Sequence, residues 1–98
     1  MTTIRRATIG DIHQIIGMAR DMHAESPRYR VLGFNAMKVG HLALTLIQDS
    51  QLGGVLVAER EGTLIGMFGF HVSKHFFSDD TFASDIVMYL KPEHRGGS

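Results

Sequence analysis

The spacing of the apolar residues changes once along this chain, close to Gly53. Before that glycine, apolar side chains recur at steps of three and four residues, which is the period of one helix face. After it, they form short runs rich in β-branched and aromatic residues, which are typical of strands separated by turns. Helices followed by consecutive strands predict the α+β class with an antiparallel sheet.

Two segments before Gly53 carry the helical pattern. The first begins near Thr8 and Asp11, whose spacing is that of a capping box with aspartate in the usual place of glutamate or glutamine. It ends before Pro27, because a residue that precedes proline is disfavoured in the helical conformation. Asn35 can cap the second helix. The two predicted apolar faces consist of Ile12, Ile15, Ile16, Ala19 and Met22, and of Val39, Leu42, Ala43, Leu46 and Ile47.

The other segments predict four strands in one domain over residues 1–98. Their ranges are Thr3–Ala7, Val55–Arg60, Thr63–Val72 and Thr81–Leu90. Glu61 and Gly62 form a short turn between two of these ranges, which predicts a hairpin. Gly66 and Gly69 lie inside a strand and indicate a bulge or a close approach to the backbone. The expected order is an N-terminal strand, two helices on one or both faces, and a three-strand antiparallel meander.

Charge and composition exclude several classes of function. The chain has 10 basic and 10 acidic residues, so no basic excess favours nucleic acid or an anionic membrane surface. Its apolar runs are far shorter than the roughly 20 residues that span a bilayer, and no signal peptide pattern is present. Cysteine is absent, which removes thiol chemistry and agrees with an expected cytoplasmic location.

Two histidines, His71 and His75, lie close to Asp79 and Asp80 in the sequence. Two histidines and a carboxylate can hold zinc. A spacing of four along a strand leaves the two rings far apart, however, and the sequence fixes no third ligand. We therefore expect no metal site.

The last ten residues, YLKPEHRGGS, lead from a strand into an arginine and two glycines. If a helix follows such a turn, its unpaired amides and the positive end of its dipole attract phosphate. Glycine allows the backbone to approach a ligand closely, and arginine adds a charge-assisted hydrogen bond. Taken alone, the same residues are more often a flexible tail.

The order of elements and three local motifs together resemble the GCN5-related N-acetyltransferase family. The motifs are TIRRATIGDI at the start, VLVAEREGTLIGM in the second and third strands, and SDIVMYLKPEHRGG in the fourth strand and the following turn. The resemblance covers the whole chain, but only about the first half to two-thirds of the family's usual domain. It implies an incomplete domain that ends at the start of the acetyl-CoA pyrophosphate loop.

The resemblance also implies where acetyl-CoA would bind. In the family, backbone groups of the fourth strand hold the pantetheine arm, and the following loop holds the pyrophosphate. The corresponding residues are Val87, Met88, Tyr89 and Leu90 on the strand, and Arg95, Gly96, Gly97 and Ser98 in the loop. Because the helix after the loop has no counterpart in the sequence, we expect this chain by itself to bind acetyl-CoA weakly or not at all.

Members of the family often use a carboxylate of the fourth strand to remove a proton from the acceptor amine, so the resemblance implies Asp85 as the candidate general base. Strict alternation along the strand would place it on one face with Val87 and Tyr89. The alternative, a strand aspartate satisfied by a neighbouring group, is equally consistent with the sequence. Tyr29 and Arg30 lie in the loop that contacts the acceptor in the family, although such residues also serve to cover a sheet edge or lie in solvent.

Two functions therefore stay open at this point. The first is an acyl-CoA-dependent N-acetyltransferase acting on an amine of a small molecule or a protein, present as an N-terminal portion or a shortened form. The second is a non-catalytic module of the same fold that acts through protein contacts, such as an inhibitor encoded by a mobile element. In either case, the strand Thr81–Leu90 has one charge and no proline, so we expect its open edge to recruit a second copy and form a homodimer.

Overall fold

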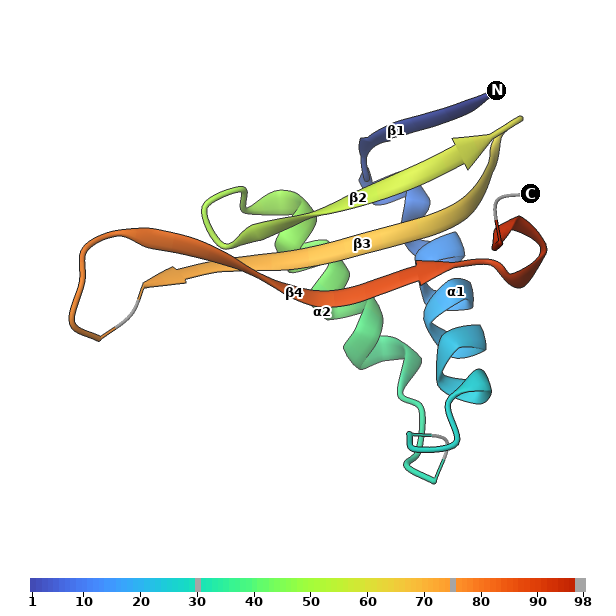
Figure 1. Ribbon diagram of the computed structural model, residues 1–98, viewed down its shortest axis with the longest axis horizontal. Coiled ribbons are helices and arrows are strands. Elements are labelled where there is room, and N and C mark those ends of the chain that lie inside the picture. Colours follow the sequence, from blue (N-terminus) through green and yellow to red (C-terminus); the bar gives the residue numbers. More distant parts are fainter. Residues whose placement is uncertain (30, 75, 97–98) are drawn as a thin grey trace.

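The computed structural model describes residues 1–29, 31–74 and 76–96 (Figure 1). Its elements are β1 (Thr2–Arg6), the 3₁₀-helix η1 (Ile9–Asp11), α1 (Ile12–Glu25), α2 (Ala36–Gln48), β2 (Gly53–Arg60), β3 (Thr63–Lys74), β4 (Thr81–Leu90) and the 3₁₀-helix η2 (Pro92–His94). The predicted α+β class and the order of elements are confirmed. The bounds of β4 match the prediction, and those of the other strands differ by one or two residues.

The helix ends lie where the sequence predicted them, for local reasons. The Thr8 amide donates a hydrogen bond of 2.7 Å to Oδ2 of Asp11, which is the predicted return bond of the capping box. Oδ1 of Asn35 accepts a hydrogen bond of 3.0 Å from the Lys38 amide at the start of α2. Helix α1 ends at Glu25, shortly before Pro27.

The four strands form one antiparallel sheet in the order β1-β2-β3-β4. Both helices pack on the same side of this sheet, as Figure 1 shows. We call that side the helix face and the opposite side the outer face. Val57, Met67 and Tyr89 are partners across neighbouring strands and belong to the buried core on the helix face. The adjacent row, Leu56, Phe68 and Met88, points to the outer face because side chains alternate along each strand.

The hydrophobic core lies between the helices and the helix face of the sheet. Its most completely buried large side chains are Met18 of α1, Val57 of β2 and Leu64 of β3. Gly53 allows β2 to start beneath this layer, since a Cβ atom there would lie 2.1 Å from the Phe70 carbonyl oxygen. The glycine at which the apolar spacing changes is thus required by the close approach of β3.

A cluster of charged residues ties the N-terminal strand to the start of α1. The Arg5 guanidinium donates hydrogen bonds to both carboxylate oxygens of Asp11, at 2.8 and 2.9 Å, and to Glu59 on β2 at 2.8 Å. Asp11 is only 6% exposed. The pKa of its carboxyl is lowered to about 2, mainly because the Arg5 guanidinium donates hydrogen bonds to the ionised form. This cluster is fully paired and is therefore a structural element rather than a binding site.

Candidate functional site on strand β4

Strand β4 contains a bulge at Ile86. Val87 pairs with Gly69, but the next pair along the strands is Asp85 with Phe70, so β4 has one more residue than β3 at this point. Gly69 lies directly opposite the bulge, and a Cβ atom there would lie 3.1 Å from Cγ1 of Val87. At the other glycine of β3, Gly66, a Cβ atom would lie 3.0 Å from the Tyr89 carbonyl oxygen. The sequence predicted a bulge or a close approach at these two glycines, and a close approach is found at both. A bulge also adjoins each of them, in β4 opposite Gly69 and in β3 beside Gly66, where Ala58 pairs with Gly66 but Glu59 pairs with Leu64.

The bulge changes the face on which Asp85 lies. We predicted that Asp85 shares a face with Val87 and Tyr89, and this prediction is wrong because the extra residue shifts the alternation by one position. Asp85 instead lines a shallow hollow on the outer face with Phe68, Phe70 and Met88. Val87 and Tyr89 remain on the helix face, where Tyr89 is 6% exposed.

Strand β4 is the last strand of the sheet, and no strand of the described residues pairs with its far edge. Val87, Met88, Tyr89 and Leu90 lie consecutively on that edge, just after the bulge. Backbone groups on such an edge can bind an extended partner by strand-like hydrogen bonds. The edge therefore fits the expected role of these four residues toward a pantetheine arm.

Three side chains form a cluster where β4 ends beside α1. The Tyr89 hydroxyl donates a hydrogen bond of 2.7 Å to Oε2 of Glu25, and Nη1 of Arg95 lies 2.8 Å from Oε1 of the same carboxylate. The Arg95 guanidinium also lies 5.2 Å from the centre of the Tyr89 ring and donates through Nε to the Leu90 carbonyl. Burial, followed by the hydrogen bond to Glu25, raises the pKa of Tyr89 to about 12. The hydrogen bonds from Arg95 and then from Tyr89 lower the pKa of Glu25.

This cluster already engages the arginine that we expected to bind phosphate. Arg95 follows η2, and Gly96 has a φ of 90°, a left-handed conformation that glycine adopts without strain. Gly97 and Ser98, the other predicted loop residues, lie outside the described residues. To meet a phosphate, the Arg95 side chain would have to exchange its contact with Glu25 for the anion.

The loop between α1 and α2 forms a hollow near the helix face. Tyr29 is 53% exposed and lines this hollow together with His23, Ser26 and Phe34. The His23 ring lies 5.5 Å from the Phe34 ring, and its Nε2 lies 2.7 Å from the Leu32 carbonyl oxygen. Arg30, the second predicted acceptor residue, lies outside the described residues.

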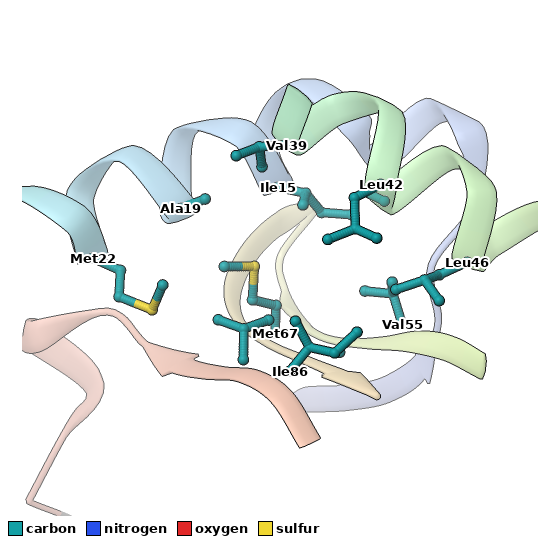
Figure 2. Close-up of a pocket in the computed structure, with 12 residues that line it drawn as sticks. Ile15, Ala19, Met22, Val39, Leu42, Leu46, Val55, Met67 and Ile86 are labelled. Atoms are coloured by element: carbon teal, nitrogen blue, oxygen red, sulfur yellow. The ribbon is translucent and has the colours of Figure 1, made fainter. Parts of the chain in front are cut away.

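A deeper cavity of about 220 Å³ lies between the two helices and the sheet (Figure 2). Side chains from α1 and α2 cover it, and strands β2, β3 and β4 form its floor. The residues that line it are Ile15, Ala19, Met22, Val39, Leu42, Ala43, Leu46, Val55, Met67, Gly69, Ile86 and Val87. The cavity therefore reaches the β4 bulge from the helix face.

Residues 1–29, 31–74 and 76–96 contain neither a cluster of metal-ligating side chains nor a helix able to span a membrane. Within these ranges no three histidine or acidic side chains gather in a way that could hold a metal ion. Neither α1 nor α2, the helices of the same ranges, combines the length and apolar character needed to cross a bilayer. His71 is exposed on β3, and His75 lies outside the described residues.

Several solved structures with the same arrangement of elements are acetyltransferases. A possible acetyltransferase from Clostridium difficile 630 matches with a TM-score of 0.80 and 15% sequence identity, over 97% of this chain and 60% of its own. A predicted acetyltransferase from Clostridium acetobutylicum, solved with acetyl-CoA, matches with a TM-score of 0.75 and 14% identity, over 99% of this chain and 64% of its own. An integron cassette protein from the mobile metagenome of Cole Harbour Salt Marsh matches with a TM-score of 0.82 and 14% identity, over 96% of this chain and 59% of its own.

This chain has a partial GCN5-related N-acetyltransferase fold. It spans about 60% of the length of the solved structures that it matches. No protein-family model and no curated protein matches its sequence. The TM-scores of 0.75 to 0.82 show the shared fold, and identities of 14–15% transfer no activity, substrate or partner to this chain.

Within the GCN5-related fold, the sequence located the edge of β4 but missed Glu25. Glu25 and Tyr89 are 64 residues apart in the sequence, and their hydrogen bond depends on how α1 lies across the sheet. Glu25 ends α1, just before Ser26 and Pro27. No sequence motif links an acidic residue at this position to a tyrosine or an arginine near the other end of the chain. No local signal could have singled it out.

Proposed function

We propose that this chain belongs to an acetyl-CoA-dependent N-acetyltransferase that acts on an amine, as its N-terminal portion or as a shortened form. The observation that carries the proposal is the bulged edge of β4 at Ile86, followed by the turn that leads to Arg95, within a fold shared with acetyltransferases. Acetyl-CoA would supply the acetyl thioester, and the Val87–Leu90 backbone would hold its pantetheine arm. The Glu25 contact of Arg95 is consistent with weak phosphate binding by these residues alone.

A thiol-release assay tests this activity, and residues 1–98 add no thiol background because they contain no cysteine. The proposal predicts that a form of the protein that continues past Ser98 and supplies the rest of the fold releases coenzyme A thiol with at least one primary amine. The 98-residue chain alone should release none above the uncatalysed rate. A continued form that binds acetyl-CoA yet acetylates no amine would favour the non-catalytic alternative.

The position of Asp85 makes its proposed role testable in the same assay. Tyr29 lines a hollow on the helix side, so an acceptor bound beside it would reach β4 from the face opposite Asp85. We therefore expect Asp85→Asn to leave turnover within about twofold of the parent across the pH range. A general base contributes about 100-fold or more, so a loss of that size would identify Asp85 as the proton acceptor and place the acceptor on the outer face.

We further propose that the chain forms a homodimer through the free edge of β4. That edge belongs to a strand of 10 residues, and Met88 beside it is 74% exposed. An uncovered edge of this length readily pairs with another chain, and two-fold pairing of like edges closes the assembly. Because acetyl-CoA would use the same edge, the coenzyme and the second copy should compete for it.

A further inference from the structure

The cavity between the helices and the sheet has an apolar lining throughout (Figure 2). Val55 and Met67 on its floor are each 6% exposed. Leu42 of α2 and Ile86 of β4 belong to the same lining but are 45% and 41% exposed, so they mark its open side. The cavity is thus a buried apolar hollow whose entrance is formed by exposed apolar side chains.

The cavity is lined by no charged side chain and by none that forms hydrogen bonds. A charged or polar group bound inside it would therefore lack a partner. An apolar cavity of about 150 Å³ in another protein is large enough to bind benzene. A volume of about 220 Å³ therefore accepts a somewhat larger group, roughly an aliphatic chain of six carbons or a substituted aromatic ring. Chemistry and size both select an apolar occupant.

Two features of the lining connect the cavity to acyl transfer to an amine. Ile86 is the bulged residue of β4, so the cavity opens beside the strand edge that would hold the thioester. Ala19, Met22 and Val39 line both this cavity and the hollow beside Tyr29, so the two spaces adjoin. A molecule that enters at the open side beside Ile86 can therefore place an apolar group in the cavity and keep its amine near β4.

We propose that this cavity binds the apolar group of the acceptor, and that the substrate class is primary amines bearing an aliphatic or aromatic group of about six carbons. Polyamines and amino sugars, which carry charge or hydroxyl groups along their length, are excluded by the same lining. This inference rests on the proposed acetyl transfer to an amine. Its test, however, is a binding measurement that needs neither acetyl-CoA nor turnover.

Isotope-labelled methionine methyl groups provide the readout, because the methionines lie both inside and outside the cavity. Met22 and Met67 line it, Met88 lies on the outer face, and Met37 is 86% exposed on α2. Titration of the chain with n-hexylamine should shift the Met22 and Met67 signals in a saturable way and leave those of Met37 and Met88 in place. The matched polar amine, 1,4-diaminobutane, should shift none of them.

Two substitutions locate the binding. Ala43→Leu fills the cavity and should weaken n-hexylamine binding at least tenfold, whereas the control Ala24→Leu, on the exposed side of α1, should not change it. If Ala43→Leu disturbs folding, Leu42→Gln at the open side should still weaken binding severalfold, since it removes apolar contact from a half-exposed position.

Several outcomes would overturn the inference. They are the absence of a saturable shift at Met22 and Met67, equal shifts with diaminobutane, or equal shifts at the outer-face Met88. A response to the hexanoyl thioester of N-acetylcysteamine, but none to n-hexylamine, would mean that the cavity receives the donor's acyl chain instead. If the thiol-release assay fails but n-hexylamine binds saturably, the proposed acetyl transfer is contradicted, whereas the proposed apolar binding site is supported.

Discussion

Met88→Lys is expected to raise the dissociation constant of the proposed dimer at least tenfold. Met88 is 74% exposed on the outer face and lies beside the free edge of β4. Lysine on an edge strand opposes pairing with another chain, because the charge loses hydration when the edge is covered. Light scattering with size-exclusion chromatography at micromolar concentration should show a dimer for the parent chain and a shift toward monomer for the variant.

Met37→Lys is the matched control for this prediction. Met37 is 86% exposed near the start of α2, away from the sheet edge, so the same change of side chain should leave the dimer intact. Added acetyl-CoA should favour the monomer of the parent chain if both use the β4 edge. A parent chain that is monomeric throughout the micromolar range would contradict the proposed pairing.

Asp11→Asn is expected to lower the free energy of unfolding by about 2 kcal/mol, because it removes the charge from hydrogen bonds to Arg5 while the site stays buried. Asp11 accepts hydrogen bonds from Arg5 and from the Thr8 amide, and its side chain is 8% exposed. For a domain of this size, such a loss corresponds to a decrease of about 10 °C in melting temperature. Glu59→Gln is the control: Glu59 is 32% exposed, and its contact with Arg5 should contribute less than about 1 kcal/mol.

The pH dependence of unfolding gives a second readout for Asp11. Its pKa is about 2 in the folded chain and 3.8 in its ordinary state, so the unfolded chain takes up a proton first as the pH falls. The contribution of the Asp11 carboxylate to the free energy of unfolding is therefore fully present above about pH 4 and is lost as the pH falls toward 2. The Asn variant should lack this part of the acid-induced loss of stability. Parallel stability curves for the two proteins between pH 5 and 2 would show that the Arg5–Asp11 contact has no such role.

The sequence predicted features that depend on short-range chemistry. Thr8 and Asn35 cap helices through their near neighbours, and Pro27 limits α1 by steric conflict, so each could be inferred from a few residues. Gly66 and Gly69 indicated crowding at β3 because the absence of a side chain is itself a local signal. The order of elements followed from these boundaries and from the change of apolar period.

Features that depend on long-range packing could not be inferred in the same way. A strand pattern assumes strict alternation, and the single extra residue at Ile86 moved Asp85 to the opposite face. The Glu25–Tyr89–Arg95 cluster and the apolar cavity both arise from the way α1 and α2 lie over the sheet. The sequence therefore located the edge that would bind the cofactor, but not the face on which an acceptor would meet it.

The most direct test of the central claim, that the bulged edge of β4 is the acetyl-CoA site, is a nuclear magnetic resonance titration of backbone amides. The Met88→Lys chain is suitable, because its β4 edge should be free of a second copy and the substitution keeps the backbone groups proposed to hold the pantetheine arm. Acetyl-CoA at millimolar concentration is expected to shift the amide signals of Val87–Leu90 and Gly96, with a dissociation constant weaker than about 100 µM. 3′,5′-ADP, which lacks the pantetheine arm, should leave the Val87–Leu90 signals unmoved. Shifts confined to other strands, or no shifts on β4, would contradict the proposed site. Low-micromolar affinity would contradict the expectation that these residues alone bind the coenzyme weakly.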